Sequence, residues 1–86
     1  MDMLRDTPYA REVMPPAVVK FKNDDGSYGG EARLERLLIK SLGREEIRLS
    51  WWIGNRMITR PLDLSERDLT LLIKRAVRQG LLKDRS

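Results

Sequence analysis

The residues best able to bind a ligand lie around Trp52, in a segment where apolar and polar side chains alternate. Alternate residues of a strand share a face, so Arg48, Trp52 and Met57 are expected together on the outer face of a hairpin. An aromatic ring beside an arginine can stack an unpaired base while the guanidinium group contacts a phosphate. The alternative is that another element or a second copy covers this face, which would make Trp52 a core residue.

The segment after Ser65 offers a second candidate surface, because its cationic residues recur on one side of a helix. The residues expected on that outer side are Arg67, Lys74, Arg75 and Arg78. Such a row could track a phosphate backbone. The alternative is an ordinary solvated surface, since Glu66 and Asp68 dilute the positive charge.

Catalytic chemistry is poorly represented in this chain. Neither Cys nor His occurs, which removes a Cys or His nucleophile, a Ser-His-Asp triad and the usual structural zinc sites. The carboxylate pairs Asp24-Asp25 and Glu45-Glu46 fall in an expected turn and at a strand entry. General acid–base catalysis needs a shaped pocket instead. We therefore expect no enzymatic activity, no cofactor and no metal.

Length and charge narrow the remaining possibilities. A chain of 86 residues makes one small domain, which is often marginally stable alone, and dimerisation is a common remedy. Residues 1–30 carry four basic and five acidic groups, whereas residues 31–86 carry thirteen basic and eight acidic groups. This gradient is consistent with an anionic partner, and the alternative is an ordinary soluble surface laced with salt bridges. The chain has no signal peptide, no membrane-spanning run and no Cys, so we expect a cytoplasmic protein.

Turn chemistry predicts a β-hairpin over residues 46–62. Gly54-Asn55 suits a two-residue turn with Gly at its first position. The expected cross-strand pairs are Ile53 with Arg56, Trp52 with Met57, Trp51 with Ile58, Ser50 with Thr59, and Leu49 with Arg60. The expected core face carries Ile47, Leu49, Trp51, Ile53, Ile58 and Leu62.

Capping signals predict a C-terminal helix over residues 66–79. Ser65 with Asp68 three residues later approximates a capping box, and Gly80 is a helix stop. The apolar stripe comprises Leu69, Leu72, Ile73, Ala76 and Val77. We expect this stripe to pack on the core face of the hairpin.

The first half of the chain is less clearly patterned. Residues 1–16 are expected to form an N-terminal arm, and residues 17–22 alternate like a strand. Residues 31–42 are rich in helix formers and end at Gly43, which favours a helix. The competing interpretation is a strand that pairs with residues 17–22 across the Asp25-Gly26 turn. The predicted fold class is α+β, with residues 17–86 forming one domain.

The order of features over residues 47–78 resembles the single-stranded-DNA-binding domain of the transcriptional coactivator family known as positive cofactor four. The resemblance rests on Ile47, Arg48 and Trp51 in the strand. At the helix entry it rests on Leu64, Ser65, Glu66 and Asp68. It implies a curved antiparallel sheet that runs into one helix. It also implies a dimer that binds unpaired strands through basic and aromatic residues of the sheet.

The resulting prediction is a dimeric, non-enzymatic module that binds nucleic acid, preferably single-stranded, or regulates transcription. Its binding residues would be Arg48, Trp52, Met57, Lys74, Arg75 and Arg78. The alternative is a small protein-interaction module, such as an adaptor or an accessory protein of a phage or mobile element. Salt dependence separates these functions, because phosphate-driven binding weakens steeply as salt rises.

Overall fold

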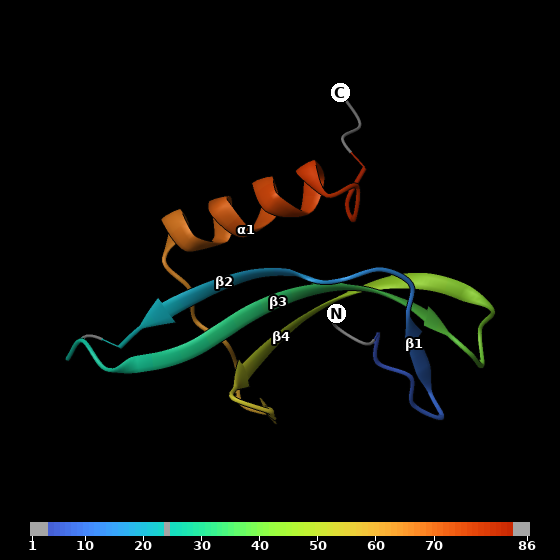
Figure 1. Cartoon of the computed structure of the whole chain (residues 1–86), viewed down its shortest axis with the longest axis horizontal. Coiled ribbons are helices and arrows are strands. Elements are labelled where there is room, and N and C mark those ends of the chain that lie inside the picture. Colours follow the sequence, from blue (N-terminus) through green and yellow to red (C-terminus); the bar gives the residue numbers. More distant parts are fainter. Residues whose placement is uncertain (1–3, 24, 84–86) are drawn as a thin grey trace.

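The computed structural model describes residues 4–23 and 25–83. It has five strands followed by one helix (Figure 1). The elements are β1 (Ala10–Glu12), β2 (Ala17–Lys22), β3 (Tyr28–Ile39), β4 (Arg44–Ile53), β5 (Arg56–Ile58) and α1 (Glu66–Arg78). All strand pairs are antiparallel, and the helix lies along one face of the sheet. The α+β prediction is therefore confirmed.

The long strand β3 is the centre of the sheet. One of its edges pairs with β4, from Glu31 opposite Trp52 to Ile39 opposite Arg44. The other edge pairs first with β2 and then with β1. Strand β1, which lies in the expected N-terminal arm, thus belongs to the same sheet as the other strands.

The predicted helix over residues 31–42 is wrong, because these residues lie in β3 and in the turn that follows it. Helix propensity is a weak preference, and pairing on both edges of β3 outweighs it. The competing strand interpretation is confirmed, since Ala32 stands opposite Val19 across the turn. Gly43, with a φ of 62°, closes the β3–β4 turn instead of a helix.

The β4–β5 hairpin forms in the predicted register. Trp52 stands opposite Met57 and Ile53 opposite Arg56. Gly54 has a φ of 61° while Asn55 has a negative φ, which is the pattern of a type II′ turn. The hairpin is shorter than residues 46–62 on its second side, because β5 ends at Ile58. The expected pairs of Ser50 with Thr59 and Leu49 with Arg60 do not form.

Helix α1 begins and ends where its capping residues predict. The Ser65 hydroxyl accepts a hydrogen bond of 3.0 Å from the main-chain N–H of Asp68. At the other end Gly80 donates to Val77, and Leu81 donates to Ala76. These two bonds form a Schellman motif, for which the positive φ of Gly80 is required. The motif turns Leu81 back into the core, where it is fully buried.

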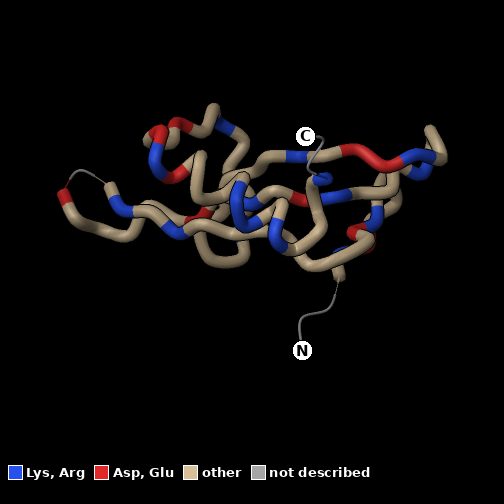
Figure 2. The backbone as a smooth tube through the Cα atoms, turned by 90° about the horizontal axis from the view of Figure 1, so that it is seen from above, with Lys and Arg blue, Asp and Glu red and all other residues tan. Residues whose placement is uncertain are grey.

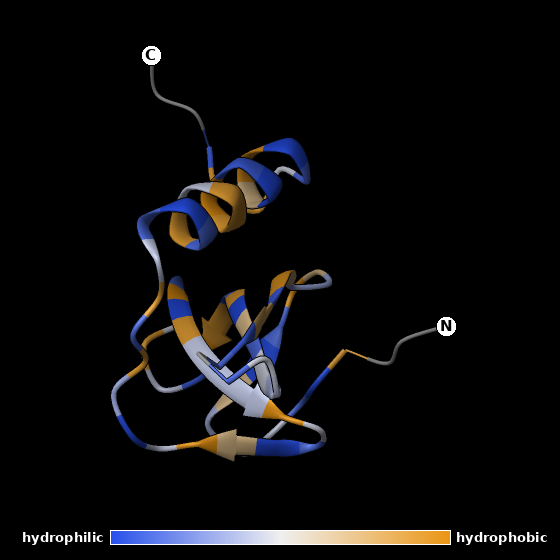
Figure 3. Ribbon diagram, turned by 90° about the vertical axis from the view of Figure 1, so that its left-hand side faces the viewer, coloured by the Kyte–Doolittle hydropathy of each residue, from blue (hydrophilic) through white to orange (hydrophobic). Residues whose placement is uncertain are grey.

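The core lies between α1 and the strands β2 and β3. Its buried residues are Ala17, Val19, Ala32, Leu34, Leu72, Ala76 and Leu81. Figure 3 shows the helix above the sheet, with apolar and polar sides. The prediction that the whole stripe packs on the hairpin is wrong, because only Leu72 and Ala76 of that stripe are buried.

The other residues of the stripe are exposed, and so are three residues that were expected on the core face of the hairpin. They are Leu69, Ile73 and Val77 on α1, and Ile47, Leu49 and Ile53 on β4. Trp51 of β4 is half-buried. A helix about 10 Å wide spans roughly two strands that lie about 4.8 Å apart. Since α1 lies over β2 and β3, it leaves β4 uncovered.

Substitutions on adjacent helix positions test this placement. Leu72→Ala should lower the free energy of unfolding by about 2–5 kcal/mol, because it opens a cavity in the core. Leu71→Ala is the control, since Leu71 is exposed and should cost well under about 1 kcal/mol. Urea unfolding followed by circular dichroism measures both values. Equal losses at the two positions would contradict the assigned face.

Candidate functional site

A buried polar network occupies the face of the sheet away from α1. Glu35 of β3 is fully buried and accepts hydrogen bonds from Arg5 Nη1 at 2.8 Å and Ser50 Oγ at 2.9 Å. Trp52 Nε1 donates to the same Ser50 hydroxyl at 2.9 Å. Arg5 comes from the N-terminal segment, and the other residues come from β3 and β4. The network therefore ties the N-terminal segment to the centre of the sheet.

Trp52 lies on the predicted outer face but is only 8% exposed. The guanidinium groups of Arg5 and Arg33 lie over its ring, at 4.6 Å and 4.4 Å from the centroid. Such cation–π contacts stabilise the ring in place. The prediction that this ring offers an open surface for stacking a base is wrong. Trp52 is a core residue instead, and Arg5 of the N-terminal segment helps to cover it.

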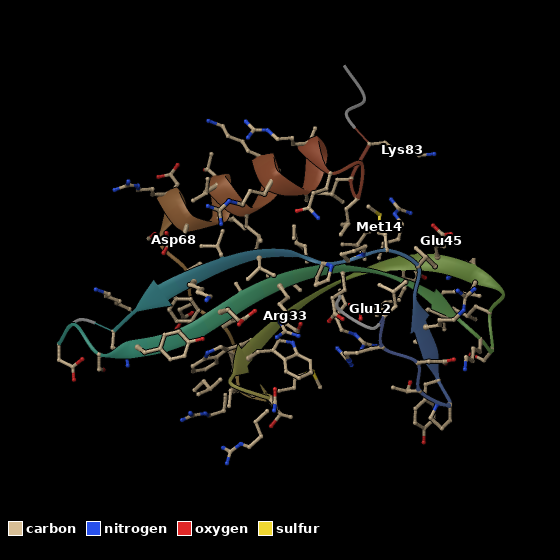
Figure 4. All side chains as sticks on the ribbon, in the orientation of Figure 1. Glu12, Met14, Arg33, Glu45, Asp68 and Lys83 are labelled. Atoms are coloured by element: carbon tan, nitrogen blue, oxygen red, sulfur yellow. The ribbon has the colours of Figure 1, made fainter. Side chains whose placement is uncertain are left out.

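Glu12 of β1 adds a second buried carboxyl to this face. Figure 4 shows Glu12 and Arg33 below the sheet, whereas Met14 lies on the α1 side. Glu12 Oε1 accepts from the main-chain N–H of Arg5 at 2.7 Å, and Oε2 has no partner among the described residues. Burial raises the pKa of the Glu12 carboxyl; the Arg5 N–H opposes this shift and the nearby Glu35 carboxyl reinforces it.

Sequence reasoning missed the polar residues of this network. Arg5 and Glu12 lay in a segment interpreted as an arm, and Glu35 lay in the expected helix. One signal was available: if residues 31–39 form a strand, alternation places Glu31, Arg33 and Glu35 on one face. The contribution of Arg5 depends on how the N-terminal segment returns to the sheet, for which the local sequence holds no signal.

The other predicted binding residues do not gather at one site. Arg48 is half-buried and stands opposite Glu35, while Met57 is exposed opposite Trp52. Lys74, Arg75 and Arg78 are exposed on α1, on the other side of the sheet. Arg75 Nη1 also donates a 2.7 Å hydrogen bond to the carbonyl of Val18. The sheet thus separates the two groups of candidate residues.

The cations of α1 differ in their pairing from many cations elsewhere in the described chain. Arg5, Arg33, Arg36, Lys40 and Arg44 form ion pairs with carboxylates at 2.6–3.1 Å. Among the described residues, no carboxylate pairs with a cation of α1. Figure 2 shows basic and acidic residues interspersed along much of the chain.

The described residues of the two carboxylate pairs make local contacts. Glu45 pairs with Arg36, and Glu46 pairs with Arg44. Asp24 lies outside the described residues, while Asp25 accepts two hydrogen bonds from Ser27, which lower its pKa. Within residues 4–23 and 25–83, no three acidic residues lie close enough together to hold a metal ion. No helix in the same ranges is long and apolar enough to span a membrane.

Comparison with known proteins adds no relative to this description. No family model, no curated protein and no solved structure matches the chain. The resemblance to the positive cofactor four family therefore stays a prediction.

Removing Arg5 tests the polar network. A buried charge that loses its partner typically costs roughly 3–5 kcal/mol of stability. Arg5→Ala should lower the free energy of unfolding by an amount near the lower end of this range. The lower end applies because Arg5 is itself partly exposed. Arg11→Ala is the control, because Arg11 is an exposed residue of the neighbouring β1. Urea unfolding curves measure both, and a neutral Arg5→Ala would show that the network does not stabilise the sheet.

Neutralising Glu12 tests its raised pKa. A carboxyl whose pKa is higher in the folded state than in the unfolded state stabilises the fold fully when the pH is below its unfolded pKa, which is near 4.5. This stabilisation is lost as the pH rises through the folded pKa. Glu12→Gln mimics the protonated carboxyl at every pH. The free energy of unfolding of the variant, relative to that of the natural chain, should therefore increase as the pH rises from about 4 to about 7. An unchanged stability difference at these two pH values in urea titrations would rule out the raised pKa.

Proposed function

We propose that this chain is a non-enzymatic nucleic-acid-binding module that holds a phosphate backbone on the outer side of α1. The observation that carries the proposal is the exposed cationic row of Arg67, Lys74 and Arg78. Residues at positions i, i+7 and i+11 recur on one side of a helix. None of the three pairs with a described carboxylate, so all are available to an anionic ligand.

The dimensions of this row suit a nucleic-acid backbone. Eleven residues of helix extend about 16 Å at 1.5 Å per residue, and successive phosphates of one DNA strand rise by about 3.4 Å. The row could therefore meet several phosphates at once. Asp68 does not interrupt the cationic row. Its main-chain N–H donates to the Ser65 hydroxyl, and its half-buried side chain lines a depression together with residues of β2. Glu66 is the acidic group at the solvent side of the first turn.

The burial of Trp52 changes the expected mode of binding. An occluded ring offers no face to an unstacked base, so the stacking argument for a single-strand preference no longer holds. Phosphate contacts carry little sequence information. We therefore expect binding that depends on charge and discriminates weakly among sequences. The resemblance to the positive cofactor four family supports nucleic acid as the ligand, but our proposal places the contact on the helix and not on the sheet.

A protein-interaction module is the second candidate function. It is favoured by the exposed apolar residues that α1 and β4 present on the same side of the sheet. Exposed apolar groups that form a continuous patch mark interaction surfaces more often than scattered ones do. The patch expected around Trp52 and Met57 supports this function less, because Trp52 is buried.

A salt titration of oligonucleotide binding tests the phosphate proposal. The double variant Lys74→Gln with Arg78→Gln should flatten the slope of log affinity against log salt by about 0.9 for each duplex phosphate that the helix no longer neutralises. Arg11→Gln with Lys22→Gln is the matched control, since both residues are exposed on strands and carry the same charge.

Three results bear on the choice of function. A flatter salt dependence in the helix variant, with no flattening in the control variant, supports the proposal. Equal flattening by both variants would mean that only net charge attracts the oligonucleotide. A folded sample that binds neither single- nor double-stranded oligonucleotide at low salt would leave protein interaction as the leading function.

A further inference from the structure

The outer edge of β4 is open along much of its length in the described sheet. Between Arg44 and Ser50 no described strand pairs with it, because β5 reaches only Trp51 to Ile53. The outer edges of β2 and β1 are each contacted by another part of the chain. Arg75 donates to the Val18 carbonyl of β2, and the Glu12 N–H of β1 donates to the Arg5 carbonyl. An open edge can pair with another strand.

The main-chain groups of Ile47 point toward this open edge. Ile47 stands opposite Arg36 of β3, and the Arg36 carbonyl accepts from the Val13 N–H on the far side of β3. In an antiparallel ladder the direction of these groups alternates along each strand. The N–H and C=O groups of Glu45, Ile47 and Leu49 are therefore directed away from β3. They are available to a further strand.

Apolar side chains adjoin this edge on the α1 side of the sheet. Ile47 and Leu49 are 40% and 46% exposed. On α1, Leu69, Ile73 and Val77 occupy the flank opposite Leu71 and Arg75, which lie over β2. A strand added beside β4 would bury Ile47 and Leu49 at the centre of a wider sheet. Burial of such side chains is the main driving force for association.

The charges along the open edge of β4 favour β4 of a second copy as the strand that pairs with it. In a two-fold antiparallel pair, one residue stands opposite its own copy, and its neighbours stand opposite each other. When Ile47 is that central residue, Glu46 stands opposite Arg48 of the partner subunit, and this pair occurs twice. Centring on Glu46 or on Arg48 would instead oppose like charges, which is destabilising.

We propose that β4 pairs with β4 of a second copy of this chain, antiparallel and centred on Ile47. The two sheets then form one continuous sheet. A two-fold axis perpendicular to that sheet places both α1 helices on the same side. Their cationic outer sides would face the same direction. The pairing itself depends only on β4 and does not rest on phosphate binding.

A charge-exchange experiment tests both the partner and the register. Glu46→Arg alone places the introduced arginine of each copy opposite Arg48 of the partner subunit, and Arg48→Glu alone opposes two glutamates. Each variant should raise the dimer Kd by about tenfold, since like charges opposite each other destabilise strand pairs. A mixture of the two variants restores both opposite-charge pairs. It should form a heterodimer with about the natural Kd, measured by sedimentation equilibrium.

Two further variants keep this test decisive. Arg48 stands opposite the buried Glu35, so Arg48→Glu could perturb folding, which circular dichroism detects. Ile47→Asp then replaces it, because Ile47 is exposed and two aspartates would meet at the axis. Arg11→Glu is the control on β1 and should leave the Kd unchanged.

The outcomes separate this inference from the proposed function. Weakened homodimers together with a restored mixture support the inference. A natural chain that stays monomeric up to about 1 mM would overturn it. A dimer that none of the β4 variants weakens would also overturn it. Oligonucleotide binding by a monomer would leave the proposed function standing without the dimer.

Discussion

The width of a single helix determines what this small fold buries and what it exposes. Helix α1 covers β2 and β3, and its buried residues Leu72 and Ala76 meet the core there. No second helix is described for the strip above β4. The exposed flank of α1 and the exposed side chains of Ile47 and Leu49 on β4 both follow from this limited coverage. The proposed second copy is one way for the chain to cover that strip.

The opposite face of the sheet is closed by polar contacts and one aromatic ring. Glu35 is satisfied by Arg5 and Ser50, and Trp52 is covered by two guanidinium groups. Buried charges are tolerated only when they are paired and hydrogen-bonded. This arrangement gives Trp52 a structural role. It leaves the outer side of α1 as the best candidate surface for an anionic ligand.

The sequence predicted correctly those turns and helix ends that depend on only a few neighbouring residues. The Gly54 turn, the Ser65 cap and the Gly80 stop each act within a few residues, and the structure has all three. Residues 31–42 were assigned wrongly, because pairing with distant strands overrides helix propensity. The burial of Trp52 depends on Arg5, whose position is set by β1. The helix stripe was correctly seen as amphipathic, but such a stripe cannot tell how many strands a helix will cover.

Amide hydrogen exchange measures most directly whether β4 pairs with a second copy. If β4 pairs with a second copy, the Ile47 amide, which points to the open edge, should exchange slowly in concentrated samples and fast after dilution. The Arg48 amide points toward β3 and should stay protected at both concentrations, which makes it an internal control. An Ile47 amide that exchanges fast at every concentration, beside a protected Arg48 amide, would show that β4 does not pair with a second copy.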